Sequence, residues 1–441
     1  MSNKRLLPLL LSLLLATGLW AQPALSPDIP TVKGYQVKVK SIDSHYKKIA
    51  GAKNLCPGKL YLIGWCGAES YLLDSAVVRK GKALFKNKAE VPCGVYGMFN
   101  DNMIGLGDII LNHNNKFTFD LADNHVEGSE ENQQLQQFRL KAKNVPVENL
   151  CREMTETMPQ SFLSKFVTVT YGANALAIDN PSLHDLLTWH LNATDLQEPR
   201  LLFSHVPVFR MIGDDIEEAV FPNSDSVIRY IRFLLDRPMC QPVRNYIIRS
   251  LFSTLDVHNP DYDPALVYLY DQYEHSWIEE GSERRIERKI NNLRKIIPGA
   301  RIPELISHDI EGKAHSTHDI KTHYTILWFW DPDCDHCQEM TPPLHQLYQE
   351  HGSDYDFEVF AVEVNDDYER WKAFSDKHQL WDWTNLSTSR GEQNIDFIEY
   401  FDIMTTPVMF LIDNTQNHTI IARQITLDEL RTFFENKTTK E

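Results

Sequence analysis

The sequence is short of basic residues and has only one long apolar run. Its 441 residues include 44 lysines and arginines against 61 aspartates and glutamates, a formal net charge of -17 at pH 7. A chain with this negative charge repels nucleic acid and anionic lipid headgroups. We therefore expect neither as a partner. The one apolar run is itself too short to cross a bilayer, and no second long apolar stretch follows, so we expect no integral membrane segment after signal cleavage.

The single apolar run lies at the N-terminus. Lys4 and Arg5 precede the run Leu6–Leu15, and small residues follow at Gly18 and Ala21. A short apolar run with these flanks is the pattern of a secretory signal peptide. We therefore expect residues 1–21 to be a cleaved signal and the protein to be exported to the periplasm.

The sequence also has few closely spaced cysteines. Among its seven cysteines, one pair lies close together, Cys334 and Cys337. A zinc site built from cysteines needs a second pair, so the sequence disfavours zinc. The five other cysteines are scattered: Cys56, Cys66, Cys93, Cys151 and Cys240. Because five is odd, at least one of them is free or paired outside the chain. A purely structural disulfide between Cys334 and Cys337 stays an alternative in an exported protein.

Hydrophobic periodicity predicts a multidomain protein. Residues 30–128 contain short strand-like runs separated by Gly, Asn and Asp turns, which favours a small β sandwich or barrel-like module. Residues 130–298 change to helical spacing, as at Ile286, Ile290 and Leu293, and predict an α-helical domain that ends at Pro298. We expect an N-terminal β module, a central α-helical domain and a C-terminal α/β domain over residues 299–441.

Strands and helices alternate in the last part of the chain, which predicts a sheet with helices on its faces. The expected elements are a strand over Thr325–Trp330, a helix from Cys334, a strand over Phe357–Val364, a helix over Asp367–His378, a hairpin of Val408–Ile412 with Thr419–Arg423, and a helix over Leu427–Phe434.

Cys334 and Cys337 carry the chemistry that the sequence predicts. With two residues between them on the first turn of a helix, their sulfurs come within bonding distance. The helix N-terminus offers unpaired N–H groups and a partial positive charge, which stabilise a thiolate at Cys334. A thiolate attacks a disulfide, and Cys337 can then resolve the mixed disulfide. The pattern predicts thiol–disulfide exchange with Cys334 as the nucleophile.

Three further features accompany this pair. Trp330 precedes it, an acidic turn with glycine spans Asp309–Lys313, and Thr406 and Pro407 precede an apolar strand. With the acidic turn first, then Trp330, the cysteine pair and the Thr-Pro pair, residues 303–434 resemble thioredoxin-like envelope oxidoreductases of the ResA/TlpA type. The resemblance implies a thioredoxin fold and a cis bond before Pro407, which faces the thiols. It implies catalytic positions at Cys334, Cys337 and Pro407 and supporting positions at Trp330, Asp335, His336 and Thr406.

The resemblance also implies a function. It predicts a periplasmic thiol:disulfide oxidoreductase without cofactor or metal, acting on client proteins with thiols or disulfides in the reducing or isomerising direction. Its electrons would come from a membrane or periplasmic donor. The β and helical parts look like accessory domains. The alternative is an envelope binding or scaffold protein whose thioredoxin fold is redox-inactive or redox-sensing.

The chain departs from the family at two positions. Trp328 stands where thioredoxin has a buried aspartate, and Met340 stands where ResA-type proteins have a glutamate. Glu339 and Glu363 are candidates to accept the proton of Cys337, although each also fits an ordinary surface or strand-end position.

Acidic residues surround the first cysteine. Asp331, Asp333 and Asp335 flank Cys334 and oppose the single histidine, His336. Because nearby negative charge raises a thiol pKa, we expect the acids to prevail and the redox potential to be moderate to reducing. Four histidines upstream of the pair have no regular ligand spacing, which disfavours a metal site: His308, His315, His318 and His323.

Overall fold

The computed structural model describes residues 27–50, 57–172, 182–218, 221–258, 260–403 and 405–438. The expected signal peptide, residues 1–21, and Cys56 lie outside these ranges. The chain divides into two compact units. One comprises Met1–Val220 and Phe233–Leu251, and the other comprises Phe221–Arg232 and Phe252–Glu441.

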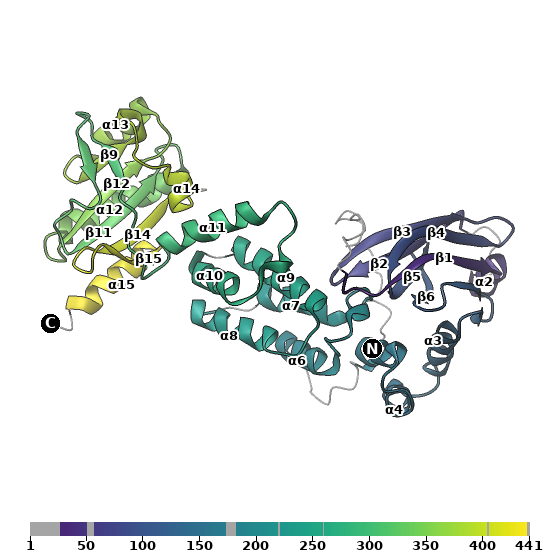
Figure 1. The fold of residues 1–441 in the computed structure, drawn as a ribbon. Coiled ribbons are helices and arrows are strands. Elements are labelled where there is room, and N and C mark those ends of the chain that lie inside the picture. The colour runs from purple at the N-terminus through teal and green to yellow at the C-terminus, as the bar shows by residue number, and fades with distance from the viewer. Residues whose placement is uncertain are drawn as a thin grey trace. The chain divides into compact units, whose positions relative to one another are not determined.

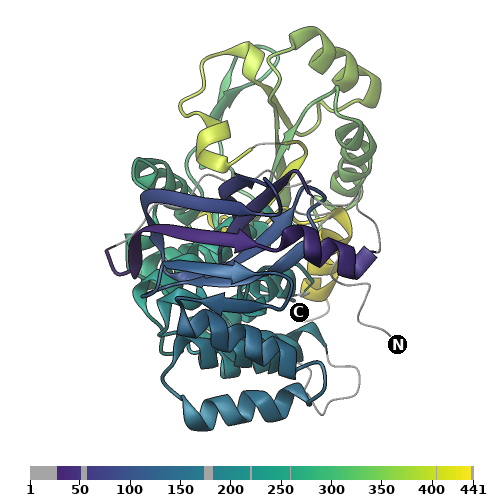
Figure 2. The same ribbon diagram turned by 90° about the vertical axis from the view of Figure 1, so that its right-hand side faces the viewer.

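The first unit contains a β sandwich (Figure 1), best seen in Figure 2. Its two four-stranded sheets have the orders β4-β1-β7-β8 and β3-β2-β5-β6. The strands are β1 (Thr31–Lys40), β2 (Lys59–Cys66), β3 (Glu69–Val77), β4 (Ala83–Pro92), β5 (Gly94–Asn100), β6 (Gly105–Leu111), β7 (Lys116–Asp120) and β8 (His125–Glu127). Helix α2 (Ile42–Ala50) follows β1. The sandwich is one of the two arrangements that the strand spacing predicted.

Strand β1 lies in the interior of its sheet. It pairs antiparallel with β4 and parallel with β7. Val37 and Val39 of β1 are buried, and their side chains share one hydrophobic core with Leu62 of β2 and Met98 of β5. Alternating apolar residues on both sheets therefore close a core between them.

Helices make up the rest of the first unit and cross into the second. They are α3 (Glu130–Lys141), α4 (Val147–Thr157), α5 (Phe162–Tyr171), α6 (Leu183–Ala193), α7 (Pro207–Glu218), α8 (Ser224–Leu235) and α9 (Gln241–His258). Serine side chains at Ser129, Ser161 and Ser182 accept hydrogen bonds from backbone N–H groups and cap α3, α5 and α6. The predicted change from strand to helix is confirmed.

Two helices of the second unit precede its sheet, α10 (Asp263–Gln272) and α11 (Glu283–Ile296). Helix α10 ends at Gln272, and Trp277 lies in a separate 3-10 turn, buried against the ring of Phe252. Asp263 is the first residue of α10, and its carboxylate binds an arginine of the sheet.

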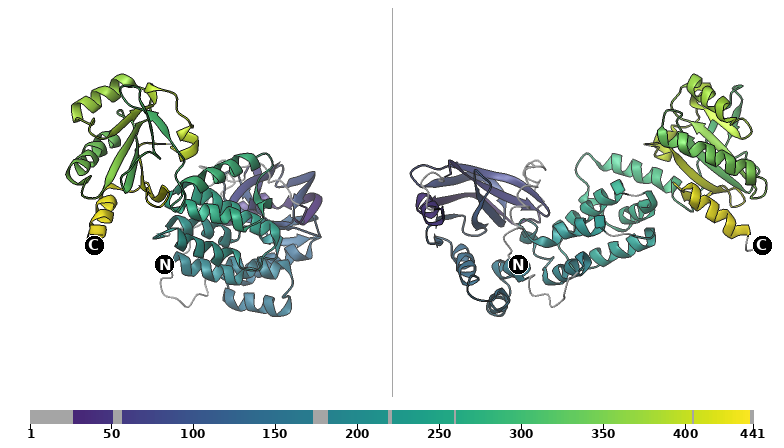
Figure 3. Two further views of the ribbon diagram at one scale, coloured as in Figure 1. Left: turned by 60° about the vertical axis from the view of Figure 1, so that its left-hand side comes forward. Right: turned by 180° about the vertical axis from the view of Figure 1, so that it is seen from behind.

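A seven-stranded sheet of order β10-β9-β13-β12-β11-β14-β15 forms the C-terminal part. Its strands are β9 (Ile306–His308), β10 (Ala314–Ser316), β11 (Tyr324–Trp330), β12 (Phe357–Glu363), β13 (Thr384–Ser387), β14 (Val408–Asp413) and β15 (Thr419–Arg423). Its helices are α12 (Asp335–His351), α13 (Tyr368–His378), α14 (Phe397–Phe401) and α15 (Leu427–Thr438). Figure 3 shows α12 lying across one face of the sheet.

Both faces of the central strand β11 are covered, which explains why its sequence is apolar throughout. Trp328 and Trp330 face the core that also contains Cys337 of α12. Phe329 points to the other face, where its ring packs on Phe401. β11 is therefore a rigid support that ends immediately before the cysteine pair.

The predicted three-part organisation, with β, helical and α/β parts in that order, is confirmed; the exact domain bounds remain predictions. Within the described ranges, no helix combines the length and the apolar character needed to cross a membrane.

Candidate active site

The two cysteines lie where β11 passes into α12. Cys334 occupies the N-cap of α12, and Cys337 lies in its first turn. The carbonyl of Asp331 accepts a hydrogen bond from the Cys334 N–H at 3.1 Å, and the Cys334 carbonyl accepts one from Gln338 at 3.0 Å. These bonds start the helix at the position that the sequence predicted.

Cys337 is the buried member of the pair. It is 0% exposed and packs in the core with Trp330 and Leu344. The backbone N–H of Asp331 donates to its sulfur at 3.5 Å. Burial raises the pKa of the Cys337 thiol to about 12, because the thiolate loses its hydration.

Cys334 is only partly buried. Burial acts to raise the pKa of this thiol, but hydrogen bonds from the backbone N–H groups of Cys337 and His336 and from the Cys337 side chain outweigh it and hold the pKa below its ordinary value. These donors belong to the N-terminus of α12, as expected for a stabilised thiolate. The predicted difference between the cysteines, in exposure and in pKa, is confirmed.

The loop before β14 lies against Cys334. The Thr406–Pro407 peptide bond is cis, which confirms the prediction. The Cys334 thiol donates to the Thr406 carbonyl at 3.3 Å. Val408 pairs with Phe329 across β14 and β11, and this register brings the loop to the end of β11. The structure thus brings Cys334, Cys337 and Thr406 together.

The flanking acids do not prevail as expected. Asp333 forms an ion pair with Arg370 of α13, which neutralises its charge beside Cys334. Burial raises the pKa of Asp331. Asp335 and the His336 side chain are exposed. The expectation that the flanking acids prevail at Cys334 was therefore wrong, because the hydrogen bonds at the start of α12 hold the pKa of this thiol below its ordinary value.

Arg370→Gln should slow alkylation of Cys334 about twofold at pH 7. The charge of Asp333 would then be uncompensated and would disfavour the Cys334 thiolate, but Arg370 is exposed, so solvent screens the effect. The measurement is the iodoacetamide rate at low and high salt. Arg431→Gln, which disrupts the surface pair with Asp428 on α15, is the control. A rate that stays at the wild-type value in low salt would contradict this role of Arg370.

Of the two acids considered as proton acceptors, Glu363 is buried and Glu339 is exposed. The Ser387 hydroxyl donates to one Glu363 oxygen at 2.6 Å, and the Asn365 N–H donates to the other at 2.5 Å. Burial raises the pKa of the Glu363 carboxyl. By strand alternation Glu363 faces the same side of β12 as Ala361, the side that borders the core around Cys337.

Three of the four upstream histidines make separate local contacts. His315 pairs with Asp309 at 2.7 Å, His318 stacks on His418, and His323 stacks on Tyr324. Within the part of the chain that the structure describes, no three potential metal ligands come together.

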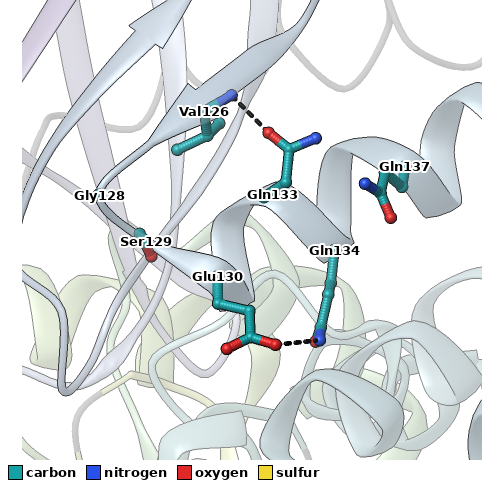
Figure 4. A pocket seen from close by; sticks show the side chains of 7 residues that line it. All are labelled: Val126, Gly128, Ser129, Glu130, Gln133, Gln134 and Gln137. Carbon is teal, nitrogen blue, oxygen red and sulfur yellow. Dashed lines mark hydrogen bonds between the residues drawn. The ribbon is translucent and has the colours of Figure 1, made fainter.

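A cavity of about 440 Å³ lies elsewhere, beside α3 in the first unit (Figure 4). Two of the glutamines that line it are engaged: Gln133 accepts from the Val126 N–H at 2.7 Å, and Gln134 donates to Glu130. The lining contains none of the cysteines.

The described cysteines outside the pair have pKa values raised by burial, to about 12 for Cys66 and about 11 for Cys93.

Comparisons with known proteins agree on the C-terminal part. A family model described as thioredoxin-like matches residues 322–419. A domain of a possible thiol-disulfide isomerase from Cytophaga hutchinsonii is 30% identical, covering 33% of this chain and 98% of that domain, with a TM-score of 0.29. The thioredoxin domain of a thiol-disulfide oxidoreductase from Bacteroides vulgatus is 23% identical, covering 32% and 98%, with a TM-score of 0.28.

A longer match is to a thioredoxin-like protein from Bacteroides caccae. It is 13% identical and covers 62% of this chain and 92% of that protein, with a TM-score of 0.37. No curated protein sequence matches the chain.

Proposed function

Because this chain belongs to the thioredoxin-like family through its C-terminal domain, we propose that it exchanges disulfides with client proteins through Cys334 and Cys337. The family confirms the thioredoxin fold that the sequence predicted. The observation that carries the proposal is the difference between the two thiols: a partly exposed Cys334 with a lowered pKa stands in front of a buried Cys337 with a raised one.

The reaction follows from this difference. The Cys334 thiolate attacks one sulfur of a client disulfide, so that bond breaks and the other client sulfur leaves as a thiolate. Deprotonated Cys337 then attacks the Cys334 sulfur and releases the second client thiol. The client gains two electrons, and the cysteine pair is oxidised. Because the Cys337 pKa is raised, this second step needs a proton acceptor, for which buried Glu363 is the candidate.

The direction and place of the reaction are part of the proposal. The protein acts in the reducing or isomerising direction in the periplasm, after removal of residues 1–21. A membrane or periplasmic donor restores the dithiol. The description of the Cytophaga hutchinsonii domain as a possible thiol-disulfide isomerase supports this direction.

Insulin reduction tests the proposal. The purified protein should accelerate the precipitation of insulin by dithiothreitol, and Cys334→Ser should return the rate to that of dithiothreitol alone, because it removes the attacking sulfur. Cys240→Ser, outside the pair, should leave the rate unchanged. A wild-type rate equal to that of dithiothreitol alone would refute catalysis and favour the binding or scaffold alternative.

A further inference from the structure

Arg423, the last residue of β15, lies between two carboxylates. Its side chain is 4% exposed; Nη1 forms an ion pair with Asp263, and Nη2 lies 3.1 Å from Oδ2 of Asp402. Asp263 is the first residue of α10, and Asp402 directly follows α14. One buried guanidinium therefore joins a helix that precedes the sheet to the segment that leads into Thr406.

This arrangement is costly for a contact that only stabilises the fold. Burial raises the pKa of Asp263 to about 6, although Arg423 opposes the rise. Nε of Arg423 is buried and finds no hydrogen-bond partner among the described residues. Apolar residues of similar volume often stabilise such a site equally well, whereas a buried ion pair fixes one geometry. Here the ion pair fixes the position of Asp402 relative to β15 and α10.

Asp402 lies at the start of the loop that reaches Cys334. Its φ of 55° is left-handed, a conformation that needs support in a residue other than glycine. On one side Phe401 is fully buried and anchors α14 against Phe329 and Phe410. On the other side the chain runs on to Thr406, whose carbonyl accepts the Cys334 thiol. Asp402 is therefore held four residues before the carbonyl that accepts the Cys334 thiol hydrogen, at the start of the same loop.

A second set of contacts joins α11 to the same part of the domain. The Lys295 ammonium of α11 lies 4.4 Å from the ring centroid of Tyr400 on α14, and the two helices lie side by side in Figure 1. After α11, the Gly299 N–H donates to the Ile420 carbonyl at 2.8 Å, and the Ile420 N–H donates to Ala300 at 2.9 Å. The segment from α11 to Ala300 therefore contacts both β15 and α14.

We propose that Arg423 is a positioning residue for thiol exchange, through which α10 sets the place of the Thr406–Pro407 loop against Cys334. The helices before the thioredoxin-like domain thereby control how readily a client disulfide reaches the thiol. This inference rests on the proposed function, since it concerns the rate of that reaction.

A double-mutant cycle on the full-length protein tests it. Asp402→Asn removes the charge that faces Arg423 from the loop, and should lower kcat/KM for insulin reduction about threefold to tenfold, the effect of one charge-assisted hydrogen bond. Asp263→Asn should lower kcat/KM about twofold to threefold in the wild type and not at all in the Asp402→Asn protein, because the connection to the loop is then already broken.

The urea midpoint separates positioning from stability. Asp263→Asn should lower the urea midpoint in the wild type and also in the Asp402→Asn protein, because Arg423 loses a partner in both, whereas its effect on kcat/KM should vanish in the Asp402→Asn protein. Asp428→Asn, at a surface ion pair of α15, is the matched control and should leave kcat/KM unchanged. Fold-changes that multiply in the double variant, or a wild-type kcat/KM in Asp402→Asn, would overturn the inference. Absence of insulin reduction by the wild type would instead refute the proposed function.

Discussion

Iodoacetamide at pH 7 should alkylate Cys334 at least about a thousand times faster than Cys337. Only a thiolate reacts, and a thiol with a pKa of about 12 is ionised to roughly one part in 10⁵ at this pH. The pKa of Cys334 lies below its ordinary value of 9.0, which gives a thiolate fraction of about 10⁻² or more. Burial of Cys337 adds a barrier to access in the same direction.

The measurement is peptide mapping of the reduced protein by mass spectrometry at timed intervals. Mapping resolves all seven cysteines, so Cys56 is followed separately. Cys334→Ser should remove the fast phase, while Cys93 and Cys151, whose pKa values burial raises to about 11, should react slowly in both proteins. Equal labelling of Cys334 and Cys337, or faster labelling of Cys337, would reverse the roles assigned to them.

Trp330→Ala should destabilise the C-terminal domain by about 3–5 kcal/mol, the usual cost of removing a buried aromatic side chain. Trp330 is 0% exposed at the end of β11 and contacts Phe374 of α13, with ring centroids 5.2 Å apart. Its loss would leave a cavity beside Cys337. Urea unfolding followed by tryptophan fluorescence measures the change, because five of the nine tryptophans lie within residues 299–441.

Two variants show whether the cost comes from lost volume. Trp330→Phe should cost much less than Trp330→Ala, because the Trp330 Nε1 is buried without a hydrogen-bond partner among the described residues, so phenylalanine removes an unsatisfied donor. Trp381→Ala should cost less than about 1 kcal/mol, because Trp381 is 37% exposed. A Trp330→Ala protein as stable as Trp381→Ala would contradict this account of the core.

The parts of the site that the sequence predicted are local in the chain. An apolar strand, two cysteines at helix spacing and a Thr-Pro pair before another apolar strand lie in short segments, and each segment determines its own geometry. The structure places Cys334, Cys337 and Thr406 together because β11 and β14 pair side by side. Strand β13 was missed, since Thr384–Ser387 is short and mostly polar, which is typical of a loop.

The charges that act on these residues come from distant positions, and no local pattern indicates them. Arg370 reaches Asp333 from α13, where it is one of several exposed charged side chains. Arg423 is 160 residues from Asp263 in the chain. A lone arginine at the end of an apolar hairpin strand indicates nothing by itself, because its partner is set by tertiary packing and not by spacing.

Strand β1 affects the order in which the sandwich can assemble. It is the first strand in the chain, yet its partner residues in β4 come 44–61 positions later and those in β7 come 80 positions later. The other sheet contains the adjacent hairpins β2–β3 and β5–β6, which close over short loops. Because closing a long loop costs more chain entropy, the hairpin sheet should form first and β1 should dock late. During synthesis, the first strand must therefore wait until residue 120 is available before it can pair with both of its neighbours.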